Sequence, residues 1–551
     1  MRLASLLLCC CSIVFYNTTS AQLLNNKPSF TRADTLRGML SPLRTCYDIN
    51  YYHLELTVNI DEKTIMGSNT FKFTAIQDFQ KLQFDLFRNL AIKKIIYKGR
   101  ALKFTREFNA VFVSFPELIK KGNSEQFTVY YSGSPTVAKN APWDGGFVYS
   151  KDASGKPWVA VACQGFGASS WWPCKDHQSD EADSVLISIT VPKGLIDISN
   201  GRLRSVRKLK NGSNQYNWFV SYPINNYNVT LNIADYAHFS DSFQGLNGKL
   251  SLDYYVLKEN LAKATTHFSA DVKPMLQSFE HWFGPYPFYR DGYKLIETPY
   301  LGMEHQSAVA YGNNYKKGYK GSDWSATGLG LKWDYLIIHE SGHEWFGNNI
   351  TSKDIADMWI HESFTTYSEG LFVESTEGKE AGARYIKGQR KNIRNDSPII
   401  GPYNVNTEGS GDMYFKGTNM LHTIRSVIND DAKWLSILRG LNQTLGLKTT
   451  TTEEVIAYIN KEAGKDLTSV FDQYLRYTEV PVLEIRKVNN EQIQFRWKAD
   501  VSGFSMPVKL KTLDSADWII VNATSEWQTL NINATDLIID TDNFYIKTKI
   551  I

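Results

Sequence analysis

The chain has 551 residues, a length that predicts three or four domains with cores of their own. Charged residues make up 21% of the sequence and the formal net charge is only +3, so neither nucleic acid nor a charged membrane surface is expected as a partner. Beyond residue 21, no stretch approaches the roughly 18 to 20 apolar residues of a membrane-spanning helix, and no transmembrane segment is expected.

Residues 1–21 have the pattern of a secretory signal peptide. Arg2 gives a positive start, an apolar stretch follows, and T-S-A at residues 19–21 has the small side chains of a cleavage site. The sequence L-L-L-C at residues 6–9 leaves a lipoprotein anchor open, although only eight residues precede its cysteine. We therefore expect an exported protein, either periplasmic or secreted.

Cysteine usage gives little support for a disulfide framework. Three of the six cysteines lie in residues 1–21, and the other three are Cys46, Cys163 and Cys174. An odd number this small does not form a framework of bridges. A Cys163–Cys174 bridge remains open in an oxidising compartment, but we favour buried thiols.

The first half of the chain has the pattern of β-strands. Apolar and polar residues alternate over residues 52–58 and 70–74, and turn signals occur at residues 98–99 and 199–201. Helical periodicity is nearly absent before residue 236. These features predict an N-terminal β domain over residues 22–240.

Helical periodicity then takes over. Apolar residues recur at helical spacing over residues 261–283, and Gly284-Pro285 stops the run. A capping-box pattern, T-T-T-E at residues 450–453, begins the helix expected at residues 453–463. Further helices are expected at residues 333–346, 359–374, 416–428 and 453–463. We assign this second domain to residues 241–480.

Alternation returns after Val480-Pro481. Strands are expected at residues 482–485, 493–497, 518–521 and 544–546. They predict a small C-terminal β-sandwich over residues 481–551, and the whole chain is predicted to be a multidomain α+β protein.

The motif H-E-S-G-H at residues 339–343 is the strongest chemical signal in the sequence. In a helix, His339 and His343 lie on one face and can bind one metal ion together, with Glu340 beside them as a candidate base. Bulky apolar residues at 333–338 indicate that this helix is buried, so its polar side chains need partners. A buried histidine pair without a metal is the alternative interpretation.

A third ligand is available in W-I-H-E-S-F at residues 359–364. Adjacent helical residues point about 100° apart, so His361 and Glu362 cannot both face the metal, and spacing alone does not choose between them. Two imidazoles and a carboxylate, with one position left for water, are the ligands of a catalytic zinc site. Glu369, seven residues after Glu362, either orients a ligand or is an ordinary solvated glutamate.

Further motifs occur on both sides of this site. They are C-Q-G and W-P-C-K-D within residues 163–176, G-P-Y-P-F at 284–288, L-G-M-E-H at 301–305 and Y-F-K-G at 414–417. With these motifs the sequence resembles peptidase family M1, the aminopeptidase N and leukotriene-hydrolase group of gluzincins. The resemblance covers nearly all of the chain after residue 21.

The resemblance implies an N-terminal all-β saddle-like domain, a thermolysin-like α/β catalytic domain and a small C-terminal β-sandwich. It implies one Zn²⁺ per chain, with Glu362 as the third ligand beside the two histidines. Glu340 would accept a proton from zinc-activated water, and Tyr414 would donate a hydrogen bond to the oxyanion. The substrate-binding residues implied are Glu304, Gln164, Gly302 and Met303.

The implied activity is that of a zinc aminopeptidase acting on peptides with a free N-terminus. Glu304 would bind the α-ammonium group, and residues 301–311 are expected to form an edge strand that pairs with the substrate backbone. A thermolysin-type endopeptidase and a catalytically silent scaffold of the same fold remain open as alternatives. The sequence predicts neither the oligomeric state nor the residue preferred at the first position of the substrate.

Several positions depart from the family pattern. Leu301 and His305 replace the first glycine and the asparagine of G-A-M-E-N. His361, Ser363 and Thr365 replace residues around the third ligand without changing the ligand itself. The sequence also ends without the large helical domain of many members, and we expect a more open active-site cavity.

Overall fold

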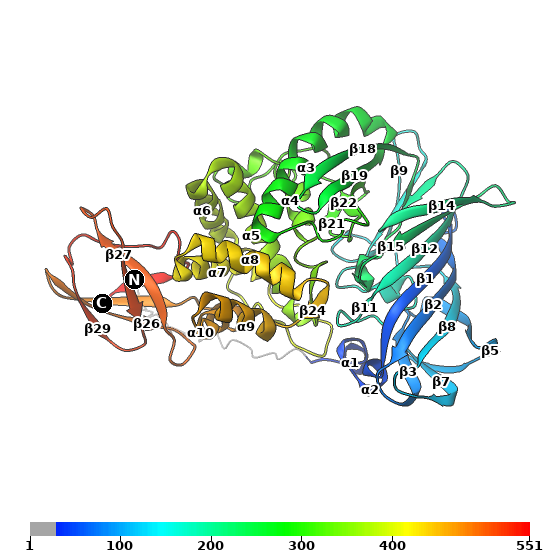
Figure 1. Ribbon diagram of the computed structural model, residues 1–551, viewed down its shortest axis with the longest axis horizontal. Helices are drawn as coiled ribbons and strands as arrows, with labels where there is room; N and C mark the ends of the chain where they lie inside the picture. The colour runs from blue at the N-terminus through cyan, green and yellow to red at the C-terminus, as the bar shows by residue number, and fades with distance from the viewer. Residues whose placement is uncertain (1–28) are drawn as a thin grey trace, which may run out of the picture.

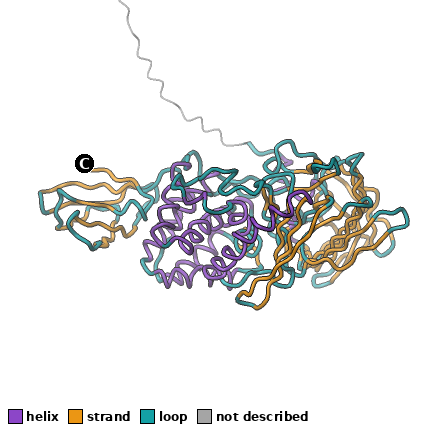
Figure 2. Tube along the Cα trace, turned by 90° about the horizontal axis from the view of Figure 1, so that it is seen from above, coloured by secondary structure: helices purple, strands orange, loops and turns teal. Residues whose placement is uncertain are grey.

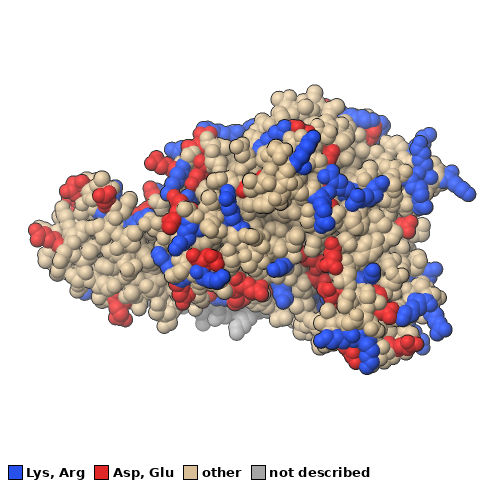
Figure 3. Space-filling view, in the orientation of Figure 1, with Lys and Arg blue, Asp and Glu red and all other residues tan. Residues whose placement is uncertain are grey.

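The computed structural model describes residues 29–551, and the predicted signal peptide lies outside these residues. A β-rich part, a helical part and a small second β part follow one another along the long axis of the molecule (Figures 1 and 2). This arrangement confirms the predicted multidomain α+β fold. Side chains of both charges are scattered over the face shown in Figure 3. In residues 29–551, no helix is long and apolar enough to span a membrane.

The N-terminal domain is built on an eight-stranded sheet. In spatial order its strands are β14 (Arg202–Lys208), β15 (Asn214–Val220), β12 (Ser184–Val191), β1 (Tyr47–Asn59), β2 (Thr64–Ala75), β8 (Ser124–Gly133), β4 (Leu90–Tyr97) and β5 (Arg100–Ala101). The alternation predicted for residues 52–58 appears as alternating burial along β1, with Leu54 and Leu56 fully buried.

Smaller sheets complete this domain. They contain β3 (Phe79–Asp85), β7 (Ala110–Ile119) and β6 (Lys103–Glu107); β13 (Ile196–Ile198), β17 (Asn232–Ala234), β10 (Pro157–Ala162) and β9 (Gly146–Lys151); and β11 (Glu181–Ala182) with β16 (Ile224–Asn225). Two short helices, α1 (Arg32–Gly38) and α2 (Pro42–Thr45), precede β1. Cys46, Cys163 and Cys174 are buried free thiols, as favoured from the sequence.

A five-stranded sheet begins the helical part. In spatial order it contains β18 (Tyr236–Gly245), β19 (Gly248–Leu257), β20 (Tyr293–Glu297), β22 (Val309–Tyr311) and β21 (Gly302–Met303). The prediction of one edge strand over residues 301–311 was wrong in extent. The chain turns back after β21, so that only β21 forms the edge and β22 lies inside the sheet.

The helices of this part pack against that sheet and against one another (Figure 1). They are α3 (Leu261–Phe283), α4 (Tyr335–Gly342), α5 (Trp359–Glu377), α6 (Lys379–Gly388), α7 (Phe415–Ile428), α8 (Asp431–Leu445), α9 (Thr452–Ala463) and α10 (Thr468–Arg476). A short parallel pair, β23 (Ile350–Ser352) and β24 (Lys448–Thr450), joins two of the connections. The capping box at α9 forms between Thr451 and Glu454, one residue later than the predicted T-T-T-E at residues 450–453.

The C-terminal part consists of two sheets. One contains β29 (Gln528–Asn531), β26 (Gln492–Lys498), β25 (Val482–Asn489) and β31 (Lys547–Ile550); the other contains β28 (Ile519–Ala523), β27 (Met506–Thr512) and β30 (Leu537–Ile539). The strand predicted at residues 544–546 was wrong. Thr423 Oγ1 accepts a hydrogen bond from Tyr545 N, and Tyr474 OH donates to Tyr545 O, so these backbone groups bind helices α7 and α10 instead of a strand.

A buried carboxyl group in β13 gives a prediction about stability. Both carboxyl oxygens of Asp197 are buried without a hydrogen-bond partner, and burial raises the pKa of Asp197 well above its ordinary value. Above about pH 4 the unfolded chain loses this proton, while the folded chain keeps it until its raised pKa is reached, so over this range folding stability falls as the pH rises, by up to ~1.4 kcal/mol per pH unit. The Asp197→Asn variant has no carboxyl group at this position and therefore lacks this pH-dependent loss of stability.

We therefore expect Asp197→Asn to unfold at a higher temperature than the wild type at pH 8, with the difference shrinking toward pH 4. Thermal unfolding followed by circular dichroism at several pH values measures it. A difference that is the same at every pH would contradict the assignment.

Candidate active site

A pocket of about 190 Å³ lies where the N-terminal domain meets the helical part. It is lined by Pro142, Trp143 and Gln164 from the N-terminal domain and by Gly302, Met303, Glu304, His339, Glu340, His343, Glu362, Glu408 and Tyr414 from the helical part. The structure thus gathers every site residue proposed from the sequence around one cavity.

The metal-ligand candidates come from two helices. His339 lies on α4 and His343 caps its C-terminal end, while Glu362 lies in the first turn of α5. Glu362 Oε2 is 3.4 Å from His343 Nε2 and 3.7 Å from His339 Nε2. Ligand atoms of all three residues lie within 4.8 Å of one another, a spacing that can hold one metal ion. The helix predicted at residues 333–346 is shorter than expected, but His343 keeps helical dihedral angles and stays on the same face.

Other bonds fix which imidazole nitrogens are available. His339 Nδ1 is 2.7 Å from Glu369 Oε1, and His343 Nδ1 is 3.0 Å from the carbonyl oxygen of Phe346. With Nδ1 engaged in this way, each ring presents Nε2 toward Glu362. Glu362 Oε2 is buried and has no hydrogen-bond partner of its own. An unpartnered carboxylate oxygen facing two imidazole nitrogens fits a bound cation.

Glu369 is no solvated glutamate. It is fully buried, and Tyr385 OH and Gln389 Nε2 donate hydrogen bonds of 2.8 Å and 2.9 Å to its second oxygen. The alternative ligand His361 points elsewhere, since its Nε2 accepts a hydrogen bond of 2.8 Å from Ser352 N. The structure therefore places Glu362 at the metal site and Glu369 behind His339.

Glu340 lines the pocket beside the histidine pair. Ligand atoms of Glu304, Glu340 and His343 also lie within 4.8 Å of one another, so two carboxylates flank the metal site. Burial raises the pKa of Glu340 to about 7. Gly302 faces it closely, because a Cβ atom there would lie 2.5 Å from Leu336 Cδ1 and 2.8 Å from Glu340 Oε1. A side chain at position 302 would force Leu336 and Glu340 to shift.

The N-terminal domain contributes directly to the position of Glu304. Gln164 Nε2 donates a short hydrogen bond to Glu304 Oε1, and Tyr227 OH donates to the same oxygen over 3.1 Å. The replacement His305 is buried without polar partners, and burial lowers its pKa to about 3, so the imidazole is neutral. The Glu304 carboxylate therefore lines the pocket despite the altered motif around it.

Tyr414 joins the pocket from the start of α7. It follows the short helix η7 (Gly411–Met413), and its ring stacks on His339 with centroids 6.1 Å apart. Sequence reasoning missed Glu408, which lies six residues earlier in a loop, and the N-terminal-domain residues Trp143 and Tyr227. None of these three belongs to a local spacing pattern, so no signal in the sequence marks them.

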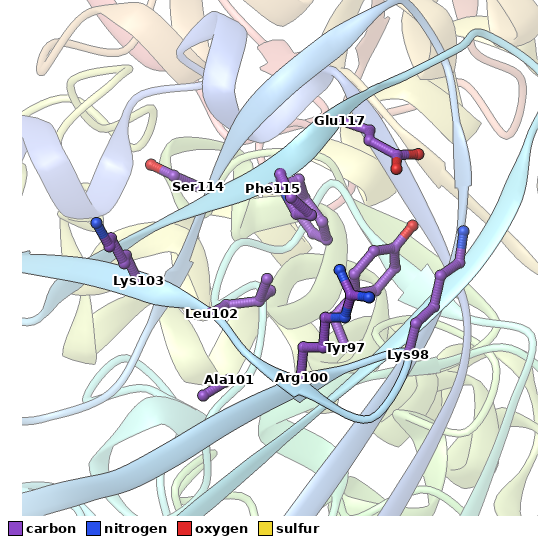
Figure 4. Close-up of a pocket in the computed structure, with 10 residues that line it drawn as sticks. Tyr97, Lys98, Arg100, Ala101, Leu102, Lys103, Ser114, Phe115 and Glu117 are labelled. Atoms are coloured by element: carbon purple, nitrogen blue, oxygen red, sulfur yellow. The ribbon is translucent and has the colours of Figure 1, made fainter.

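A larger cavity of about 520 Å³ lies in the N-terminal domain (Figure 4). It is lined by the β4–β5 hairpin and by residues of β7, among them Tyr97, Leu102 and Phe115. Its wall includes no histidine or cysteine and only one carboxylate, Glu117. The chemistry of the lining, and not the volume, therefore identifies the smaller pocket as the active-site candidate.

Two known families of protein domains match this chain. The Peptidase M1 N-terminal domain matches residues 48–228, and the Peptidase family M1 domain matches residues 269–474. The chain belongs to peptidase family M1. This confirms the resemblance noted in the sequence, and the cluster of His339, His343 and Glu362 fits one catalytic Zn²⁺.

Individual relatives are distant. Leukotriene A-4 hydrolase of Xenopus laevis is 23% identical over 434 residues, which cover 74% of this chain and 67% of the relative. Probable aminopeptidase 2 of Sulfurisphaera tokodaii is 22% identical over 462 residues, covering 76% of this chain and 57% of the relative. The chain thus spans little more than half the length of the second protein.

Solved structures share the fold. The M1 zinc metallopeptidase from Deinococcus radiodurans has a TM-score of 0.65 at 20% identity, and the match covers 82% of this chain and 96% of that one. A mutant of that metallopeptidase has been solved bound to a Tyr-Ser-Ala substrate.

The hydrogen bond between Glu369 and His339 leads to a prediction about metal affinity. Removing the carboxylate in Glu369→Ala frees the His339 ring, and we expect zinc affinity to fall about 10- to 100-fold. Glu369→Gln keeps an oxygen that can accept from Nδ1 and should lose less. Competition with a chromogenic chelator measures both dissociation constants, and an unchanged value for Glu369→Ala would contradict the role given to Glu369.

Proposed function

We propose that the protein is an exported zinc aminopeptidase that hydrolyses the N-terminal peptide bond of peptides. The observation that carries this proposal is the Glu304 carboxylate, which lines the pocket within reach of the zinc-ligand group. Export is supported by the signal-peptide pattern of residues 1–21.

His339, His343 and Glu362 would hold the ion, and bound zinc would polarise the carbonyl group and lower the pKa of a water molecule. Glu340 is placed to accept the proton of the attacking water and to deliver it to the leaving amine. Tyr414 lines the pocket from the start of α7, and its phenol can donate a hydrogen bond to the developing oxyanion. These three roles together describe hydrolysis of an amide bond.

Glu304 explains why hydrolysis would be confined to the first bond. Its carboxylate is buried, and its partners Gln164 and Tyr227 are neutral hydrogen-bond donors. A buried charge without a counter-ion costs several kcal/mol. A free α-ammonium group supplies the counter-ion, whereas an internal amide leaves Glu304 uncompensated.

The relatives support the same class of substrate. One has a name that describes an aminopeptidase, and a mutant of the Deinococcus protein was solved with a bound tripeptide. The longer relatives contain segments that this chain does not match. Peptides are therefore proposed as its substrates and are not carried over from those relatives.

The proposed activity predicts chelator-sensitive turnover. Fluorogenic aminoacyl amides with free amines should be hydrolysed, a chelator should abolish the activity, and added Zn²⁺ should restore it. The N-acetylated forms of the same amides serve as controls. Cleavage of an N-acetylated peptide at an internal bond would indicate an endopeptidase instead, and no chelator-sensitive turnover of any free-amine substrate would indicate a silent scaffold.

The role of Glu304 can be tested separately from the metal. Glu304→Gln keeps the size of the side chain but removes the charge that pairs with the α-ammonium group. We expect kcat/KM for free-amine substrates to fall about 100-fold, in line with the loss of one buried charge pair. Zinc affinity should change by less than about threefold, because Glu304 is not in the proposed ligand set. An equal loss of zinc binding would place Glu304 at the metal instead.

A further inference from the structure

One carboxylate in the pocket has no assigned role. Glu408 lies in the loop before η7 and lines the pocket together with Gln164, Glu304 and Tyr414. Ligand-forming atoms of Glu304 and Glu340 cluster with His343, and Glu408 belongs to neither of the metal-type clusters among the described residues. Glu408 is therefore not one of the two carboxylates that gather at His343.

A hydrogen bond between the two domains and another within the N-terminal domain hold this part of the wall in place. The carbonyl oxygen of Gly165 accepts hydrogen bonds from Arg37 Nη2 at 2.8 Å and from Asn406 Nδ2 at 3.1 Å. Asn406 belongs to the loop that carries Glu408, and a Cβ atom on Gly165 would lie 3.2 Å from Glu408 Oε1. The Glu408 carboxylate thus lies against the loop that carries Gln164.

The Glu408 carboxylate has no partner within residues 29–551. It accepts no hydrogen bond and forms no ion pair there, and no cationic side chain offsets its charge. Burial raises the pKa of Glu408 to about 7. A half-buried carboxylate that faces a pocket and lacks a counter-ion in the protein is placed to receive a cation from a ligand.

The charge balance of the pocket leads to the same conclusion. Four carboxylates line it, those of Glu304, Glu340, Glu362 and Glu408, and no lysine or arginine does. The two charges of a zinc ion offset two of them, and the α-ammonium group of a peptide offsets a third. One negative charge is left for a second cation on the substrate.

We propose that Glu408 binds the cationic side chain of the substrate's first residue, so that the enzyme prefers peptides beginning with arginine or lysine. This proposal rests on the proposed aminopeptidase activity. The guanidinium group can bind a carboxylate through two parallel hydrogen bonds, which favours arginine over lysine. Met303, Pro142 and the ring of Trp143 line the same pocket and can contact the alkyl part of such a side chain.

Two other roles for Glu408 make different predictions. If Glu408 helped to hold the α-ammonium group, its loss would weaken all free-amine substrates by the same factor. If Glu408 only supported the loop, its loss would also act on all substrates alike. Only a side-chain contact changes the ratio between substrates that differ in side-chain charge.

The test compares arginine with citrulline, which has nearly the same shape but no charge. At pH 8 we expect the wild type to hydrolyse the arginine amide reporter with a kcat/KM at least about tenfold above that of the citrulline reporter. In Glu408→Gln the ratio should fall to within about twofold of one. The exposed Glu526 of the C-terminal part provides a matched control, and Glu526→Gln should keep the wild-type ratio.

A binding measurement keeps this test independent of turnover. Calorimetry with the zinc-loaded wild type should show L-arginine binding about tenfold more tightly than L-citrulline, and Glu408→Gln should bind the two about equally. A wild type without preference, or a variant that keeps it, overturns the role of Glu408 while leaving the aminopeptidase proposal intact. Absence of turnover for arginine, citrulline and leucine reporters alike overturns the aminopeptidase proposal, and the arginine-to-citrulline affinity ratio still decides the role of Glu408.

Discussion

Electrostatic repulsion among buried carboxylates is the constraint on which the active site depends. Four carboxylates face one pocket, and the two histidines beside them are needed in the neutral form to bind a metal. Negative charges at this spacing are stable in a buried setting only when cations lie between them. Zinc supplies part of the positive charge that the pocket needs, and the proposed specificity follows from the negative charge that zinc leaves unpaired.

The protein meets this constraint by docking two domains. The N-terminal domain supplies neutral donors, Gln164 and Tyr227, that bind one oxygen of Glu304. Across the same interface Asn228 Nδ2 donates to Asn348 Oδ1, and Asn348 Nδ2 donates to the carbonyl oxygen of Glu304. Because these donors are neutral, they do not offset the charge of the Glu304 carboxylate. The interface thus positions the Glu304 carboxylate but supplies no cation that pairs with it.

Local patterns in the sequence predicted those parts of the fold that depend on interactions between residues close together in the chain. The helix at residues 261–283 has the predicted bounds, because the Gly284-Pro285 pair ends it in any context. The spacing of His339 and His343 likewise predicted their shared face. The choice between His361 and Glu362 was not local, because it depends on the backbone of Ser352, which binds the imidazole.

Long-range contacts account for what sequence patterns left out. Glu408 lies against the backbone of Gly165, which is more than two hundred residues away in the sequence. Tyr545 is not part of a strand because α7 and α10 form hydrogen bonds with its backbone. No periodicity encodes such contacts. The fold class and the metal-ligand spacing could be read from the sequence, whereas the partners that set each carboxylate's environment could not.

The geometry of β21 connects these features. Among the described strands of its sheet, β21 lies at the edge, so its outer backbone groups are free to pair with an extended peptide. Gly302 lets that backbone approach Glu340 closely, since any larger residue would meet the carboxylate. In the proposed function, Glu304 binds the α-ammonium group of a peptide held there, and the first side chain of the peptide reaches Glu408. If the proposed roles of Glu304 and Glu408 are correct, this edge strand and the two carboxylates together recognise both charges of a basic N-terminal residue.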